Sequence, residues 1–155
     1  QFNYVPAEHR NVAAYAGCEP MEGMADVMNQ LARHNNVYII SSRSYKKAVE
    51  GTEEWFDNVG VKGLAGIICG IEPWRKPMLC TMLNTRLHID DDPDGVVPMI
   101  ELGHGLLMQN NAYPKNELAQ RIFPFVTNWA DIQRVMIQLK LFGPPRHAIQ
   151  QEMVF

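Results

Sequence analysis

The chain has 155 residues, of which 46% are hydrophobic and 20% are charged. That length is enough for one domain with a real core, and the composition is typical of a soluble globular protein. The net charge of -3 argues against a surface that coats nucleic acid, because such a surface is usually strongly basic. No apolar run approaches the roughly 18 residues of a membrane-spanning helix, and no signal peptide is visible.

The cysteines indicate a reducing compartment. Cys18, Cys69 and Cys80 form no CxxC pair and no His/Cys spacing suited to zinc. An odd number of cysteines also argues against a disulfide framework. We therefore expect an intracellular protein, of the cytoplasm or an organellar matrix.

Residues 1–19 carry the weakest pattern in the chain. Residues 2–5 have the alternation and residue types of a short strand, which Pro6 would stop. Residues 11–17 have the composition of a short helix. The chain begins with Gln1 rather than Met, as a processed product, a fragment or a segment of a longer polypeptide would.

Regular patterns begin at Pro20. Apolar residues recur at helical spacing from Met21 to Leu31 and predict a helix that ends at Asn35. Residues 37–40 predict a buried strand, and an unbroken apolar run of this kind suits a parallel sheet covered on both faces. A second helix is predicted over residues 44–58.

Short strands and a long helix follow downstream. The strands are predicted at 66–70, 87–89 and 105–109, with loops at 72–77 and 110–116, and the helix runs from Trp129 to Leu141 behind the N-cap Asn128. Alternating helices and short apolar strands predict a single α/β layer domain with a mainly parallel sheet. Residues 146–155 are predicted to be a tail.

Polar residues stand where each predicted strand ends. Ser41 and Ser42 follow the first strand, Lys76 lies in the loop after the second, and Asp90 and Asp91 follow the third. Ligands bind outside the carboxyl ends of parallel strands, so these residues are predicted to meet. Hydroxyls donate to phosphate oxygens, a lysine neutralises their charge, and paired aspartates coordinate Mg²⁺.

A plainer interpretation exists for each of these residues. Two serines after a strand are often only a turn, a Lys-Pro pair is often surface, and an Asp-rich stretch is often an exposed acidic loop. The shared position at strand ends, in this order along the chain, favours phosphate binding by Ser41, Ser42 and Lys76 and metal binding by Asp90 and Asp91. Asp92 and Asp94 are predicted to be turn residues.

These residues carry a resemblance to the haloacid dehalogenase-like superfamily. Residues 37–43 resemble its second motif, an apolar strand that ends in a phosphate-binding Ser or Thr. Lys76 before Pro77 is similar to the third-motif lysine, and Ile89-Asp90-Asp91 resembles the fourth motif, whose acidic pair holds Mg²⁺. The resemblance implies a three-layer Rossmann-like fold, a Mg²⁺ cofactor and phosphatase or phosphotransferase chemistry.

Three further features are most similar to the 5′-nucleotidase branch of that superfamily. They are the short spacing from Lys76 to Asp90, the Pro20-x-x-Gly23 that opens the first helix, and the late Asn128-Trp129. The resemblance covers about residues 20–140. It implies a small phosphorylated ligand such as a nucleotide.

The chain departs from the family at the first motif. That motif is a strand ending in Asp-x-Asp, whose first Asp is the nucleophile, and no such motif precedes Pro20. The candidate strand at 2–5 is followed by Pro6-Ala7-Glu8, and proline can neither attack phosphorus nor ligate a metal. Asp92-Pro93-Asp94 has the right letters but lies beyond the fourth motif.

Three functional hypotheses remain. The domain is catalytically inactive as it stands and serves as a structural or binding part of a larger protein or assembly. Alternatively, it is a Mg²⁺-dependent phosphomonoesterase, nucleotidase-like, whose nucleophile strand lies outside these residues. A third hypothesis is an α/β domain of another superfamily with an acidic surface turn. In the first two, the missing first-motif strand would be central in the sheet, and its absence would leave two unpaired edges.

Overall fold

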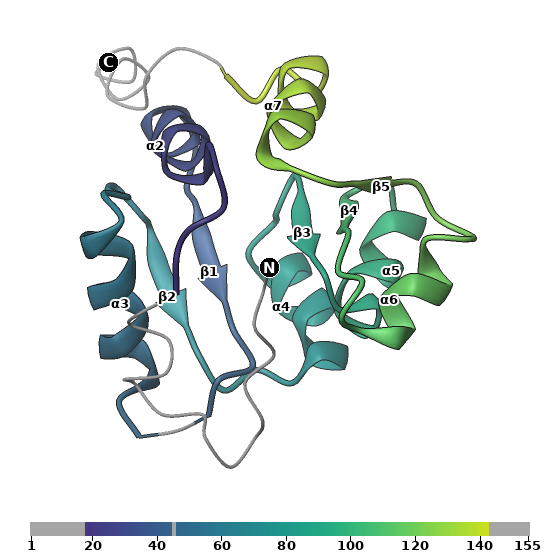
Figure 1. The fold of residues 1–155 in the computed structure, drawn as a ribbon, viewed down its shortest axis with the longest axis horizontal. Helices are drawn as coiled ribbons and strands as arrows, with labels where there is room; N and C mark the ends of the chain where they lie inside the picture. Colours follow the sequence, from purple (N-terminus) through teal and green to yellow (C-terminus); the bar gives the residue numbers. More distant parts are fainter. Residues whose placement is uncertain (1–17, 45, 143–155) are drawn as a thin grey trace, which may run out of the picture.

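The computed structural model describes residues 18–44 and 46–142, in which helices and short strands alternate (Figure 1). The predicted strand at 2–5, the predicted helix at 11–17 and the tail at 146–155 lie outside the described residues. The elements, in chain order, are α2 (Met24–His34), β1 (Tyr38–Ile40), α3 (Ala48–Asn58), β2 (Gly66–Ile68), the 3-10 turn η2 (Pro73–Arg75), α4 (Lys76–Met82), β3 (His88–Asp90), α5 (Pro93–Glu101), β4 (Gly105–Met108), α6 (Pro114–Ala119), β5 (Phe125–Val126) and α7 (Trp129–Gln138).

All strand pairings in the described part of the chain are parallel, as the sequence predicts. They form two sheets, one with the order β1-β2 and one with the order β3-β4-β5. Tyr38 stands opposite Gly66 in the first sheet, and His88 stands opposite Gly105 in the second. In the described residues the predicted single sheet is therefore split into two sheets, and the break lies between β1 and β3.

Helix α2 confirms the predicted stripe of apolar residues. Met24, Val27, Met28 and Leu31 are all buried. The helix begins at Met24, three residues after the start of the predicted stripe at Met21. Gly23 has a φ of 76°, which lies outside the helical region and interrupts the helical path from Pro20. The predicted C-terminal residue Asn35 ends the helix, and its backbone N–H donates to the Leu31 carbonyl.

Two helices arise where the sequence predicts turns. Asp92 caps the N-terminus of α5, and its side chain accepts a hydrogen bond from the backbone N–H of Asp94. Asp92 and Asp94 thus start a helix rather than form a turn. Helix α6 likewise begins at Pro114, in the stretch predicted as polar turn. Proline is favoured in the first turn of a helix, so the same residue that ends one element can begin the next.

Helices cover both faces of strand β4. Leu106 packs with buried residues of α2 and α7, among them Val27, Leu31, Ile132 and Met136. The next residue, Leu107, is fully buried on the other face, against Val96 of α5 and Ala119 of α6. Successive side chains of a strand point to opposite faces, so these two contacts place helical layers on either side of the sheet.

The other sheet is half-buried rather than fully buried as predicted. Every residue of β1 keeps partial exposure. Ile39 and its register partner Ile67 pack against Met24 and Met28 of α2 and Phe56 of α3, so α2 and α3 lie on the same face of β1 and β2. No helix among residues 18–44 and 46–142 has the length and apolar character needed to cross a membrane.

Gly105 allows α5 to lie close to β4. A Cβ atom at this position would come within 2.3 Å of the Ile100 backbone nitrogen and 2.7 Å of the Met99 carbonyl carbon. Those atoms belong to the backbone of α5, which cannot rotate away as a side chain can. The close approach of helix and strand therefore depends on glycine.

We expect Gly105→Ala to lower the free energy of unfolding by about 3 kcal/mol, because overpacking against a backbone forces the helix to shift. The measurement is urea-induced unfolding followed by circular dichroism. Gly60→Ala is the matched control: its φ is 80° with nothing within 4 Å of the added Cβ, so it should lose only about 1 kcal/mol from backbone strain. Equal losses in the two variants would contradict the packing argument.

Candidate functional site

The centre of the candidate site is a buried ion pair at the carboxyl end of β3. Lys76 begins α4, Asp90 ends β3, and the lysine Nζ lies 2.5 Å from Asp90 Oδ2. The two side chains are only 8% and 9% exposed. The sequence therefore predicted correctly that the loop lysine and the strand-end aspartate would meet.

The first turn of α5 closes over Asp90. The Asp92 backbone N–H donates to Asp90 Oδ1 at 3.1 Å. A Cβ on Gly95 would lie 2.9 Å from Asp90 Oδ2 and 3.3 Å from the Lys76 side chain, so glycine leaves the space that the ion pair occupies. Both carboxylate oxygens of Asp90 are thus engaged, one by the lysine and one by the helix N-terminus.

His88 contributes a second positive charge to this cluster. It lies two residues before Asp90 on β3, and residues at that spacing share one face of a strand. Its Nε2 is 3.5 Å from Asp90 Oδ2 and makes no geometrically sound hydrogen bond, so the attraction is mainly electrostatic. Burial opposes protonation, but the Asp90 carboxylate and the Cys80 thiol outweigh it and raise the pKa of His88 to about 9.

Asp90 stays ionised in this environment. Burial by itself would raise its pKa, but the nearby imidazole of His88, the charge of Lys76 and the Asp92 N–H together hold the pKa well below its ordinary value. Asp90 is therefore a fixed negative charge between two cations.

Asp91 differs from its neighbour in both contacts and charge. Its Oδ2 accepts a hydrogen bond from Asn110 Nδ2 at 2.6 Å. Burial raises the pKa of Asp91, and the negative charge of Asp90 raises it further, although the Asn110 bond opposes both. A cation beside Asp91 would relieve this repulsion between adjacent carboxylates.

Asn116 ties the Asp91 backbone to the loop after β4. This side chain is fully buried, and its Nδ2 donates to the carbonyls of Asp91 at 2.6 Å and Met108 at 2.8 Å. Its Oδ1 accepts from the Asn110 backbone N–H at 3.0 Å and from Gln120 Nε2 at 2.6 Å. Its two donated hydrogen bonds hold the strand ends of β3 and β4 together, and its two accepted bonds tie the loop after β4 and the end of α6 to them.

The predicted serines lie on the other sheet. Ser41 follows β1, where its backbone exchanges hydrogen bonds with Ile68 and Ile71, and its Oγ accepts from the Arg43 N–H at 3.2 Å. Ser42 is exposed. Among the described residues, no hydrogen bond or ion pair joins either serine to Lys76 or Asp90.

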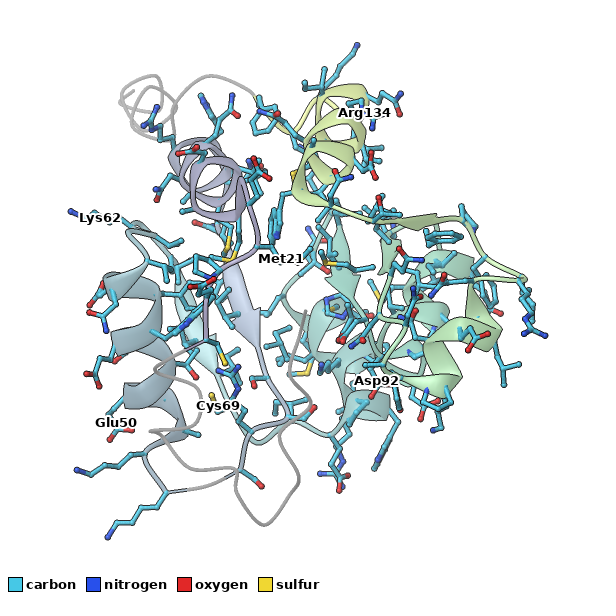
Figure 2. The ribbon with its side chains drawn as sticks, viewed as in Figure 1. Met21, Glu50, Lys62, Cys69, Asp92 and Arg134 are labelled. Atoms are coloured by element: carbon cyan, nitrogen blue, oxygen red, sulfur yellow. The ribbon has the colours of Figure 1, made fainter. Side chains whose placement is uncertain are left out.

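The two sets nevertheless lie at one end of the molecule. The arrows of β1 and β3 point the same way in Figure 1. Cys69, which follows β2, and Asp92, which follows β3, both lie toward the lower end of the view in Figure 2. The carboxyl ends of both sheets therefore face the same side.

The donor atoms of the acidic pair suit a hard divalent cation only in part. Asp90 and Asp91 supply adjacent carboxylates, and Mg²⁺ commonly binds one or two carboxylates together with waters and substrate phosphate. Within residues 18–44 and 46–142, however, no group of three or more His, Cys, Asp or Glu side chains converges as a metal site. Because the Asp90 carboxylate is already paired with Lys76, Asp91 is the residue that would hold Mg²⁺ most directly.

Sequence reasoning missed three residues of the site. His88 had a signal, since its spacing of two from Asp90 on a strand puts both on one face. Asn116 and Gly95 had no such signal, because Asn and Gly are common in turns and their residue types do not indicate a buried contact.

Comparison with known proteins finds no matching family model, no matching curated protein and no matching solved structure.

Lys76→Met should lower the free energy of unfolding by about 3 kcal/mol, because it leaves a buried carboxylate without its closest partner. Lys115→Met is the matched control, since Lys115 pairs with Asp94 at 2.6 Å on the exposed surface, where such pairs stabilise little. Chemical denaturation of both variants is the measurement. Equal stability of Lys76→Met and wild type would mean that the ion pair contributes nothing.

The raised pKa of His88 predicts a loss of stability in mild alkali. A histidine with a pKa of 6.5 unfolded and about 9 folded stabilises the protein fully below pH 6.5, and this contribution disappears as the pH rises to 9. The expected loss is on the order of 3 kcal/mol. Urea denaturation from pH 6 to pH 9.5 measures it.

His88→Gln is the test variant for this dependence, because glutamine stays neutral over the whole range. Its stability should change less than that of wild type between pH 6.5 and 9, whereas His104→Gln, at an exposed position, should keep the wild-type slope. Parallel profiles for wild type and His88→Gln would contradict a charged His88.

Proposed function

We propose that this chain is an α/β domain of haloacid dehalogenase-like ancestry that binds a small phosphorylated ligand, such as a nucleotide, together with Mg²⁺, and that it does not hydrolyse this ligand by itself. In this proposal it is a binding or structural part of a larger protein or assembly. The observation that carries it is the buried Lys76–Asp90 pair at the carboxyl end of a parallel strand, next to Asp91.

The arrangement of helices supports a three-layer, Rossmann-like architecture. Helices α2 and α3 share one face of β1 and β2. Helix α7 packs with α2 on that side of the core, while α5 and α6 pack on the opposite face of β4. Parallel strands with helices on both faces place ligands at the carboxyl edge of the sheet, where Lys76, Asp90 and Asp91 lie.

Each residue has a role that follows from its surroundings. Lys76 and His88 offset the negative charges of Asp90 and Asp91, which lowers the repulsion of a nearby phosphate. Asp91 offers its carboxylate to Mg²⁺, and bound Mg²⁺ would neutralise phosphate oxygens and polarise the phosphorus centre. Ser41 and Ser42 at the end of β1 would donate hydroxyl hydrogen bonds to the same phosphate.

The proposed lack of turnover is supported by the contacts of the Asp90 carboxylate and by the sequence before Pro20. Neither oxygen of Asp90 is available for attack, since Lys76 and the Asp92 N–H hold both. The sequence before Pro20 contains no Asp-x-Asp motif to supply another nucleophile. Binding without hydrolysis is therefore the function that these residues support.

One observation favours a second candidate function, a Mg²⁺-dependent phosphomonoesterase of nucleotidase type. Strands β1 and β3 do not pair with each other, although both border the same cavity of about 460 Å³. A strand supplied from outside residues 18–142 with an aspartate at its carboxyl end would stand between Ser41 and Asp90. That strand would provide the nucleophile that the described residues lack.

The deciding experiment combines phosphate release with ligand binding by the 155-residue chain. We expect no Mg²⁺-dependent release of phosphate from p-nitrophenyl phosphate. We also expect amide signals at the ends of β1 and β3 to shift in NMR spectra when inorganic phosphate is added, with a larger effect in the presence of Mg²⁺.

Asp91→Asn is the informative variant, and Asp94→Asn is its control, since Asp94 pairs with Lys115 on the surface. Loss of one carboxylate ligand should weaken Mg²⁺ binding roughly tenfold or more, whereas the control should bind as wild type does. Turnover by the wild-type chain would establish the phosphomonoesterase instead. Absence of both phosphate and Mg²⁺ binding would refute both candidate functions.

A further inference from the structure

Lys76 holds the position on Asp90 that a metal cation would need. Its ammonium nitrogen Nζ lies 2.5 Å from Asp90 Oδ2, and the two side chains are 8% and 9% exposed. The other carboxylate oxygen, Oδ1, accepts the Asp92 N–H at 3.1 Å. Mg²⁺ contacts its oxygen ligands directly, at about 2.0–2.1 Å, and an ammonium on the same oxygen would repel it. Asp90 is therefore closed to Mg²⁺ as long as Lys76 stays in this position.

Asp91 does not make up for the loss of Asp90. Asn110 Nδ2 donates to Asp91 Oδ2 at 2.6 Å, so one of the two oxygens of this carboxylate is already engaged. A single carboxylate is a poor ligand set for Mg²⁺, which commonly binds one or two carboxylates together with substrate phosphate. We therefore expect weak Mg²⁺ binding to the site when phosphate is absent.

The ammonium of Lys76 still has donors for an anion. A lysine carries three N–H donors, and in the part of the chain that the structure describes its hydrogen bond goes to Asp90 Oδ2 alone. Two N–H groups of a side chain that is only 8% exposed thus have no acceptor among these residues. Buried donors are almost always hydrogen-bonded, so a ligand with several acceptor oxygens, such as phosphate, suits this position.

His88 allows Asp90 to lose Lys76 without being left unpaired. A buried carboxylate without a partner is strongly destabilising, but His88 Nε2 lies 3.5 Å from the same Oδ2 atom. This buried nitrogen has no hydrogen-bond partner among the described residues. Departure of the ammonium would leave Oδ2 free to accept from the imidazole. A carboxylate has about four lone-pair sites, so Asp90 can accept from His88 and Asp92 and still bind a cation.

The surroundings of Lys76 leave room for this movement. The ammonium of a lysine stands at the end of a flexible four-carbon stem. Gly95 faces that stem, because a Cβ at this position would lie 3.3 Å from Lys76 Cδ and 2.9 Å from Asp90 Oδ2. A larger residue would fill the space between helix α5 and the ion pair.

We propose that Lys76 blocks the metal position on Asp90 in the absence of phosphate, and that a bound phosphate draws the ammonium away and opens this carboxylate to Mg²⁺. This role rests on the proposed function, since it concerns the phosphate and the cation of the same site. Asp90 and Asp91 would then both be available as carboxylate ligands. By thermodynamic linkage, phosphate would strengthen Mg²⁺ binding by the same factor as Mg²⁺ strengthens phosphate binding.

A blocking lysine and a merely structural lysine predict opposite effects of removing the charge. If Lys76 only holds Asp90 in place, its replacement should weaken Mg²⁺ binding, because the carboxylate loses its fixed orientation. If Lys76 blocks Asp90, its replacement should strengthen Mg²⁺ binding, because a second carboxylate becomes available.

The test is isothermal titration of the intact 155-residue chain with MgCl₂ in the absence of phosphate. We expect Lys76→Gln to bind Mg²⁺ roughly tenfold more tightly than wild type, within the usual range of coupling between two sites. Lys115→Gln is the matched control, since it removes a lysine that pairs with Asp94 at 2.6 Å on the exposed surface, and it should bind as wild type does. An affinity of Lys76→Gln equal to or weaker than that of wild type would overturn the proposal.

A double variant separates access to Asp90 from a general effect of charge. If the gain arises because Asp90 becomes a ligand, Lys76→Gln combined with Asp90→Asn should bind Mg²⁺ no more tightly than wild type. A gain that persists in the double variant would show that Asp90 is not the group that Lys76 blocks, and this result would also overturn the proposal.

Wild-type protein provides a measurement that does not depend on the folding of any variant. The NMR signals of the Lys76 Nζ nitrogen and the Asp90 carboxyl carbon report on their contact. Inorganic phosphate without metal should shift both signals at the concentrations that shift the amides at the ends of β1 and β3. If those amides shift and the Lys76 and Asp90 signals stay unchanged, this proposal fails and the proposed function stands. Absence of phosphate and Mg²⁺ binding in wild type and in the variants would refute both.

Discussion

The buried ion pair between Lys76 and Asp90 is the constraint on which the site depends. Two charges with 8% and 9% exposure are stable only when they are paired, so the start of α4 and the end of β3 must stay in contact. The same carboxylate accepts the Asp92 N–H, which fixes the start of α5. Gly95 leaves the room for this arrangement. One aspartate thus orients three elements, which is a structural role as much as a functional one.

The second constraint is the completeness of the sheet. In the described residues β1 pairs with β2 and β3 pairs with β4, and a cavity lies between β1 and β3. Because backbone groups alternate in direction along a strand, some N–H and C=O groups of both strands point into this cavity. The division of the sheet also explains why β1 is half-buried although its apolar run predicts full burial. Packing and chemistry are linked here, because Asp90 stands at the end of β3, one of the two strands that border the cavity.

Much of the fold could be predicted from periodicity. The stripe from Met24 to Leu31 and the N-cap Asn128 led to α2 and α7, and short apolar runs led to β1 and β3. Helices α5 and α6 were missed because Pro93 and Pro114 read as turn residues, whereas each stands in the first turn of a helix. Strand β5 has only two residues, too few for an alternation to be recognised.

The sequence by itself determined which chemical groups stand at the strand ends, because the order of strand, serine, lysine and aspartate is written in the chain. It also led to the prediction that Ser41, Lys76 and Asp90 would meet where parallel strands end, and the contact of Lys76 with Asp90 agrees with that prediction. Only the tertiary structure decided that Asp90 is held by Lys76 and His88 while Asp91 binds Asn110. These adjacent carboxylates look alike in sequence. Their pKa values move in opposite directions because burial, neighbouring charge and hydrogen bonds depend on residues brought together by folding.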